Sequence, residues 1–81
     1  MRRRNKKLQT VRAYIENIVY HNEDNHYSVL DASLDGEPIT LVGYFPYISP
    51  GETLEVSGDY ISHPVYGEQF SASSFTVVPP E

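Results

Sequence analysis

TVRAYIENIVY, residues 10–20, is the stretch of this 81-residue chain that decides its fold. From Val11 to Ile15 the apolar residues alternate with polar ones, as in a half-buried strand, whereas Ile18 has the opposite parity. A β-bulge near Glu16 and Asn17 explains this phase break, because one extra residue bends a strand and shifts its alternation. The sequence therefore predicts a long, bent first strand.

Four further runs read as strands. Frequent glycine and proline leave no room for a long helix, and Val, Ile, Thr, Tyr and Phe fill the intervals. Asp35-Gly36 is a tight-hairpin signal, because glycine tolerates the positive φ of such turns. The last run changes parity along its length, as the first one does. The expected strands are residues 27–34, 39–45, 54–60 and 69–78.

Five antiparallel strands, of which the first and last are long and bent, suit a small closed barrel, since bent strands pair on two sides and leave few free edges. We expect an all-β, five-stranded OB-fold-like barrel over residues 10–78. An SH3-like barrel or a small sandwich is the alternative. Residues 79–81 then begin a linker, and residues 1–9 form a flexible basic leader.

Charge is distributed unevenly along the chain. The formal net charge of −5 combines six Lys and Arg residues, all within residues 1–12, with 11 Asp and Glu residues, all after residue 12. A surface built from residues 13–81 alone lacks the cations that usually neutralise phosphates. The leader is an electrostatic arm that could bind phosphate backbones through Arg2, Arg3, Arg4, Lys6 and Lys7.

Several classes of protein do not fit the sequence. Without cysteine there is no disulfide or thiolate metal site, and His21, His26 and His63 match no compact ligand motif. No apolar run resembles a signal peptide or a membrane span, so we expect a cytoplasmic protein without membrane contact. No catalytic or metal-binding constellation is predicted.

Three stretches resemble a known family. Residues 42–58 (VGYFPYISPGETLEVSG), residues 63–70 (HPVYGEQF) and residues 15–30 are similar to the N-terminal OB-like domain of RecD-like ATP-dependent DNA helicases. Together they span most of residues 10–80. The spacing between PGE, Gly58 and the pattern HPxYGxQF carries the resemblance.

The resemblance implies a fragment of a longer helicase that acts in DNA recombination and repair. Its ATP- and Mg-dependent motor would follow this module in the chain. This sequence contains no G-x-x-x-x-G-K-[ST] phosphate loop, so we expect the fragment to be non-catalytic and to need no cofactor. Relatives tend to carry basic residues at the variable positions of HPxYGxQF, where this chain has Val65 and Glu68.

The candidate binding residues lie on two loops. In OB-folds the loops between strands one and two and between strands four and five flank the usual ligand face. Here these loops are residues 21–27 and the HPxYGxQF segment, which indicate Tyr27, His63, Tyr66 and Phe70. Gly67 would supply a positive φ for the return into the last strand.

Most aromatic rings are expected to pack in the core or at its rim, because each buries a large area. The rings that could stack on bases are Tyr20, Tyr27, Tyr44, Phe45, Tyr47, Tyr60, Tyr66 and Phe70.

Two functions remain open. The first is an accessory module that contacts the helicase motor domains of the same chain or another protein and guides single-stranded DNA. The second is a self-standing module that binds single-stranded nucleic acid through its aromatic rings and its basic leader.

Overall fold

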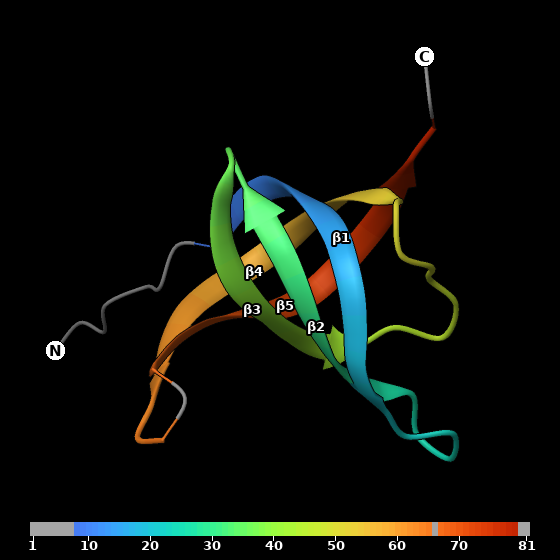
Figure 1. Cartoon of the computed structure of the whole chain (residues 1–81), viewed down its shortest axis with the longest axis horizontal. Coiled ribbons are helices and arrows are strands. Elements are labelled where there is room, and N and C mark those ends of the chain that lie inside the picture. The colour runs from blue at the N-terminus through green and yellow to red at the C-terminus, as the bar shows by residue number, and fades with distance from the viewer. Residues whose placement is uncertain (1–7, 66, 80–81) are drawn as a thin grey trace, which may run out of the picture.

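The computed structural model describes residues 8–65 and 67–79 and arranges them as a closed barrel of five strands (Figure 1). The predicted site residues Tyr66, Arg2, Arg3, Arg4, Lys6 and Lys7 lie outside the described residues. No helix with the length and hydropathy of a membrane span occurs in the described part. The strands are β1 (Gln9–His21), β2 (Tyr27–Leu34), β3 (Glu37–Tyr44), β4 (Thr53–His63) and β5 (Gly67–Val78).

The strand order around the barrel is β1-β2-β3-β5-β4. This confirms the predicted all-β five-stranded barrel and is consistent with an OB-fold. One part of the prediction was wrong, because β3 and β5 pair in parallel, with Thr40 opposite Gln69 and Val42 opposite Ser71. A ring with an odd number of strands cannot alternate direction at every contact. A closed five-stranded barrel therefore requires at least one parallel pair.

Strand β1 bends at two bulges. Its pairing with β2 skips Glu16 and, three residues later, Val19. The first bulge confirms the prediction near Glu16 and Asn17, and the second lies beyond it. The first half of β1, Gln9 to Tyr14, also pairs with β4. The bends let one strand serve both sides of the barrel.

Strand β5 carries a corresponding irregularity. Ser57 pairs with Ser74 and the next residue, Gly58, pairs with Ala72, so the register skips Ser73. A Cβ atom on Gly58 would overlap the carbonyl oxygen of Ser71. Glycine is therefore needed at this point because the two backbones approach too closely for a side chain.

Strands β2 and β3 form the predicted tight hairpin. Leu34 pairs with Glu37, and the two residues between them, Asp35 and Gly36, have φ values of 52° and 82°. Both central residues of the turn are therefore left-handed, as in a type I′ turn. Because the turn is so short, β3 begins at Glu37, two residues earlier than the sequence predicted.

Aliphatic side chains and two phenylalanines fill the barrel. Phe45 and Phe70 are the largest fully buried side chains, and Phe75 packs against Phe45 edge-on with ring centroids 5.0 Å apart. The tyrosines, in contrast, lie outside the core. Tyr27 is half-buried, and the other tyrosines of the described residues are exposed. The buried cluster consists of Ala13, Ile15, Leu30, Ala32, Leu41, Phe45, Leu54, Val56 and Phe70.

Candidate functional site

A groove of about 620 Å³ lies on the outer face of β1, β2 and β3. Cross-strand pairing explains its composition, because residues that face each other across a ladder share one side of the sheet. One row joins Tyr20, Val29 and Val42, and the next joins Asp31, Thr40 and Gln69. We call this surface the aromatic groove; it is lined by Val19, Tyr20, Tyr27, Val29, Asp31, Thr40, Val42, His63 and Gln69.

The β1–β2 loop is tied down by its own asparagines. Asn22 Oδ1 accepts hydrogen bonds from the backbone N–H groups of Asp24 (2.8 Å) and Asn25 (3.2 Å). Asn25 Oδ1 accepts a third from the N–H of Tyr27 (2.9 Å). His26 has a φ of 68°, so the chain turns sharply before β2 begins. These contacts fix the position of Tyr27 at the mouth of the groove.

A buried serine links the two histidines of this loop. Ser28 Oγ donates to the carbonyl oxygen of His26 at 3.0 Å and lies 2.8 Å from His21 Nδ1. The single hydroxyl proton of Ser28 is used for His26, so Nδ1 of His21 carries the proton of the second bond. The rings of His21 and His26 lie 5.6 Å apart. No group of three His, Cys, Asp or Glu residues in the described ranges is placed to hold a metal ion.

Two exposed tyrosine rings border the aromatic groove. Tyr20 is 50% exposed, and its hydroxyl oxygen accepts a hydrogen bond from Asn22 Nδ2 at 3.2 Å. Tyr44, 62% exposed, meets Tyr27 edge-on with ring centroids 5.3 Å apart. These rings therefore have fixed neighbours on one side and open surface on the other.

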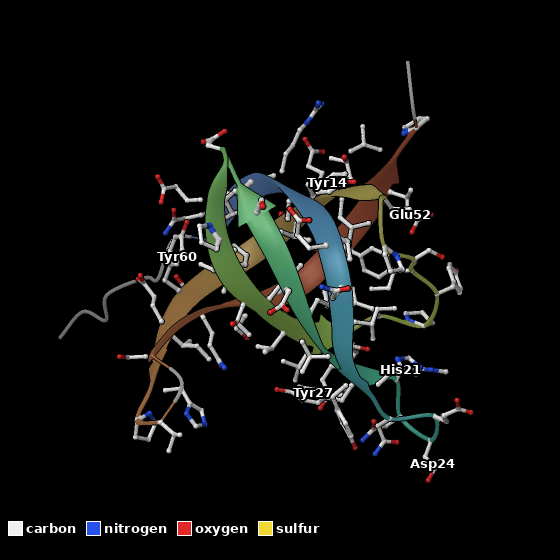
Figure 2. The ribbon with its side chains drawn as sticks, in the orientation of Figure 1. Tyr14, His21, Asp24, Tyr27, Glu52 and Tyr60 are labelled. Carbon is white, nitrogen blue, oxygen red and sulfur yellow. The ribbon has the colours of Figure 1, made fainter. Side chains whose placement is uncertain are left out.

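The β4–β5 loop forms the other border. His63 ends β4, and its Nδ1 accepts a hydrogen bond from the N–H of Val65 at 3.0 Å. Gly67 begins β5 with a φ of 84°, which confirms the predicted positive φ. In Figure 1 both loops project from the lower side of the barrel as viewed, this loop at the left and the β1–β2 loop at the right. Figure 2 shows Tyr27 and His21 in the lower half of the same view, with Tyr14 and Glu52 in the upper half.

A second hollow of about 590 Å³ adjoins the aromatic groove and shares Asp31 and Thr40 with it. Its other charged residues are Glu16 and Glu68. Ser33 donates a hydrogen bond to Glu16 Oε2 at 2.8 Å, which holds that carboxylate beside the hollow. We call this surface the acidic hollow; its remaining lining residues are Asn17, Ala32, Ser33, Pro38 and Ile39.

No Lys or Arg of the described part of the chain lies on either surface. Arg12, the last Lys or Arg in the sequence, lies on the part of β1 that pairs with β4, and its Nε is 3.9 Å from Glu55 Oε2. Among residues 8–65 and 67–79, no Lys or Arg lines the aromatic groove or the acidic hollow. The charges of these described residues therefore give this face a negative field.

The structure brings two of the predicted site residues together. Tyr27 and His63 line the same groove from opposite borders. Phe70 does not belong with them, because its side chain is fully buried in the core and packs edge-on against Tyr60 at 5.0 Å. Phe70 therefore supports the barrel wall and cannot contact a ligand directly.

Sequence reasoning missed most of the groove floor. Val29 and Asp31 alternate with the inward-facing Leu30 and Ala32, so the parity of this strand already placed them outside. Thr40, Val42 and Gln69 join them only through strand register. The pairing register of β3 and β5 could not be predicted, because it joins residues far apart in the sequence and no short motif indicates it.

The family comparison bears on the whole barrel. The OB-fold domain of the ATP-dependent DNA helicase YrrC matches residues 8–80. The chain belongs to this family. No solved structure matches it.

Membership of the YrrC OB-fold family gives the groove a structural context. In OB-folds the ligand face lies between the loops that join strands one and two and strands four and five. The aromatic groove of this OB-fold domain extends from Tyr20 and Tyr27, beside the first loop, to His63, beside the second. The groove thus occupies the position at which OB-folds bind their ligands.

Proposed function

We propose that this domain is a non-catalytic accessory module of a RecD-like DNA helicase that acts in recombination and repair. Its role is to dock, through the aromatic groove, on the motor domains of the same chain or on a partner protein in the cytoplasm. The motor would supply the ATP- and Mg-dependent chemistry. Family membership as a helicase OB-fold domain supports the helicase part of the proposal.

One observation carries the docking role: an exposed aromatic and aliphatic groove with no Lys or Arg among its described lining residues. Val19 is 60% exposed and Tyr20 50%, so the groove offers large apolar side chains to a partner. Its charged residue is Asp31, and Glu16 and Glu68 lie in the adjoining hollow. Apolar and aromatic side chains are the anchors of protein interfaces, whereas a negative face repels phosphates.

A second candidate is the binding of single-stranded DNA. The exposed rings of Tyr20 and Tyr44 favour it, because bases stack on such rings in single-strand binders. In this alternative the leader cations hold the strand. The absence of Lys and Arg from residues 13–81 makes it the weaker of the two.

Two binding measurements test the proposal. Calorimetry measures binding of the 81-residue chain to the separately purified motor domains of its helicase. Fluorescence anisotropy measures binding to a labelled oligo-dT of about 20 nucleotides at about 150 mM salt, where the backbone contacts of a cation-poor surface are weak. We expect motor binding, and oligo-dT binding that is lost when residues 1–9 are deleted.

Micromolar affinity for oligo-dT that survives deletion of residues 1–9 would contradict the docking role. Absence of binding to the motor domains would exclude docking within the same helicase, and a partner pull-down with the Tyr20→Ala variant as control then decides whether another protein docks.

A further inference from the structure

The aromatic groove and the acidic hollow adjoin each other and differ in chemical character. They share the lining residues Asp31 and Thr40, so a ligand in one lies beside residues of the other. The end beside the β1–β2 loop is apolar and aromatic, with Val19, Tyr20 and Val29. The other end carries the carboxylates of Glu16 and Glu68.

This arrangement selects one kind of partner. An extended segment with large apolar side chains fits the first end, where it covers exposed tyrosine and valine surface. Arg or Lys side chains that follow it fit the second end, where Asp31, Glu16 and Glu68 gather and the described lining of both surfaces contains no Lys or Arg. A nucleic acid matches the rings but not the carboxylates. A second copy of this chain has all its Lys and Arg within residues 1–12, where Leu8 comes after the run of cations from Arg2 to Lys7 and not before it.

We propose that the surface from Tyr20 to Asp31 and Glu68 binds a linear protein segment in which large apolar residues are followed by Arg or Lys. The proposal rests on the docking function above and specifies the chemistry of the docked partner. The surface determines where each kind of side chain lies: the apolar residues lie beside the β1–β2 loop, and the cations lie beside Asp31. Tyr20 pairs with Val29, two residues before Asp31 on β2, and lines the same groove, so its ring is placed to add cation–π attraction to the Coulomb term.

A labelled synthetic peptide provides the test. The probe is a nonapeptide with Leu-Phe and Arg-Arg separated by one to three glycines, titrated into the full 81-residue chain by fluorescence anisotropy. We expect a dissociation constant of about 10–100 µM, as for a weak linear-motif interface. Replacement of both Arg by Glu in the probe should abolish binding. A rise in salt from about 50 to about 300 mM should weaken binding roughly 3- to 10-fold, because exposed ion pairs are screened.

Matched variants locate the contact. Tyr20→Ala should weaken peptide binding by roughly 5-fold or more, as expected for an aromatic anchor, whereas Tyr20→Phe should retain most of it. Tyr47→Ala is the control, because Tyr47 is 75% exposed and lies outside both surfaces. Asp31→Asn should weaken binding roughly 3-fold, and Asp24→Asn, in the exposed β1–β2 turn, should leave it unchanged.

The outcomes separate this inference from the proposed function. If the motor domains bind but Tyr20→Ala and Asp31→Asn leave that affinity unchanged, the inference is wrong and docking uses another surface. Oligo-dT binding that Tyr20→Ala abolishes, or dimerisation of the chain that Tyr20→Ala abolishes in sedimentation, would overturn the assigned partner. Loss of both motor and peptide binding in the same variants supports the proposal.

Discussion

Two outer faces of the same barrel differ in the polarity of their side chains and in the contacts that these side chains make. Around the middle of β4 the outward residues of β1, β4 and β5 are polar, whereas Tyr14, Ile61 and Val77 are exposed elsewhere on these strands. Thr10 Oγ1 and Ser57 Oγ lie 2.8 Å apart, and Arg12 lies beside Glu55. The outward positions on β5 opposite these residues are Ser74 and Thr76. We call this the polar face.

The face on β1, β2 and β3 has the opposite composition. Its rows run from Tyr20 through Val29 to Val42 and from Tyr27 to Tyr44. Both faces follow the same period-two alternation and enclose the same core, so the requirements of the barrel do not explain the difference. Tyr20, Tyr27 and Val29 line one groove on this face, and on this basis we propose that a partner covers it. The predictions below test this division in order of expected effect.

The largest effect should come from Phe70, the predicted binding residue that the structure places in the core. Phe70→Ala should lower the free energy of unfolding by about 3–5 kcal/mol, because it removes a fully buried ring and leaves a cavity. Urea denaturation followed by circular dichroism measures this. Phe70→Leu, which keeps most of the volume, should cost about 1 kcal/mol. If Phe70→Ala left the stability unchanged, the core role of Phe70 would be wrong, and the original prediction that it binds a ligand would stand.

The contact between β4 and β5, on the polar-face side of the barrel, should be the next most sensitive. Gly58→Ala places a Cβ atom against the carbonyl of Ser71, so the strands must separate, at a cost of about 1–3 kcal/mol. Thermal unfolding measures the change, and Ser57→Ala at the neighbouring, half-buried position of the strand is the control. A Gly58→Ala protein as stable as the parent would show that this backbone approach is not required.

A smaller and local effect is expected at the border of the aromatic groove. Asn22→Ala removes the acceptor for the N–H groups of Asp24 and Asn25 and should cost about 1–2 kcal/mol. Amide chemical shifts should change in the β1–β2 loop and at Tyr20 while those of the polar face stay fixed. Asp24→Ala, at an exposed position of the same loop, should change stability by less than about 0.5 kcal/mol. Equal effects of the two variants would argue against this capping role.

The smallest effect should come from the ion pair on the polar face. Arg12 and Glu55 lie 3.9 Å apart with exposed side chains, so Glu55→Gln should change stability by at most about 0.5 kcal/mol. Differential scanning calorimetry at low and high salt measures this. The same substitution should leave peptide binding unchanged. A loss of binding in Glu55→Gln would contradict the division between the two faces.

Local patterns in the sequence predicted much of the barrel. The parity change between Ile15 and Ile18 located the first bulge, and Asp35-Gly36 located the hairpin. These signals are local, because a bulge or a turn is determined by a few adjacent residues. The parallel pair of β3 and β5 escaped prediction because it joins residues far apart in the chain, such as Leu41 and Phe70.

The site was less predictable for the same reason. Tyr27 and His63 could be proposed from loop position alone, and both line the groove. Phe70 follows the same loop in the sequence, but strand alternation directs it inward, opposite to Gln69. Asp31 becomes a candidate site residue only because Tyr20, Thr40 and Glu68 line the same two surfaces, and these residues come from three other strands. The sequence alone shows that these residues are acidic or uncharged. Only the pairing register of the strands shows that they lie beside one another.

A heteronuclear NMR titration of the labelled 81-residue chain tests the central claim most directly. With the Leu-Phe and Arg-Arg peptide added, we predict amide shift changes at Tyr20, Val29, Asp31 and Thr40 and none at Thr10, Glu55 and Thr76. Oligo-dT at the same concentrations should leave the first set unchanged. Shifts on the polar face with peptide, or shifts in the groove with oligo-dT alone, would contradict the account.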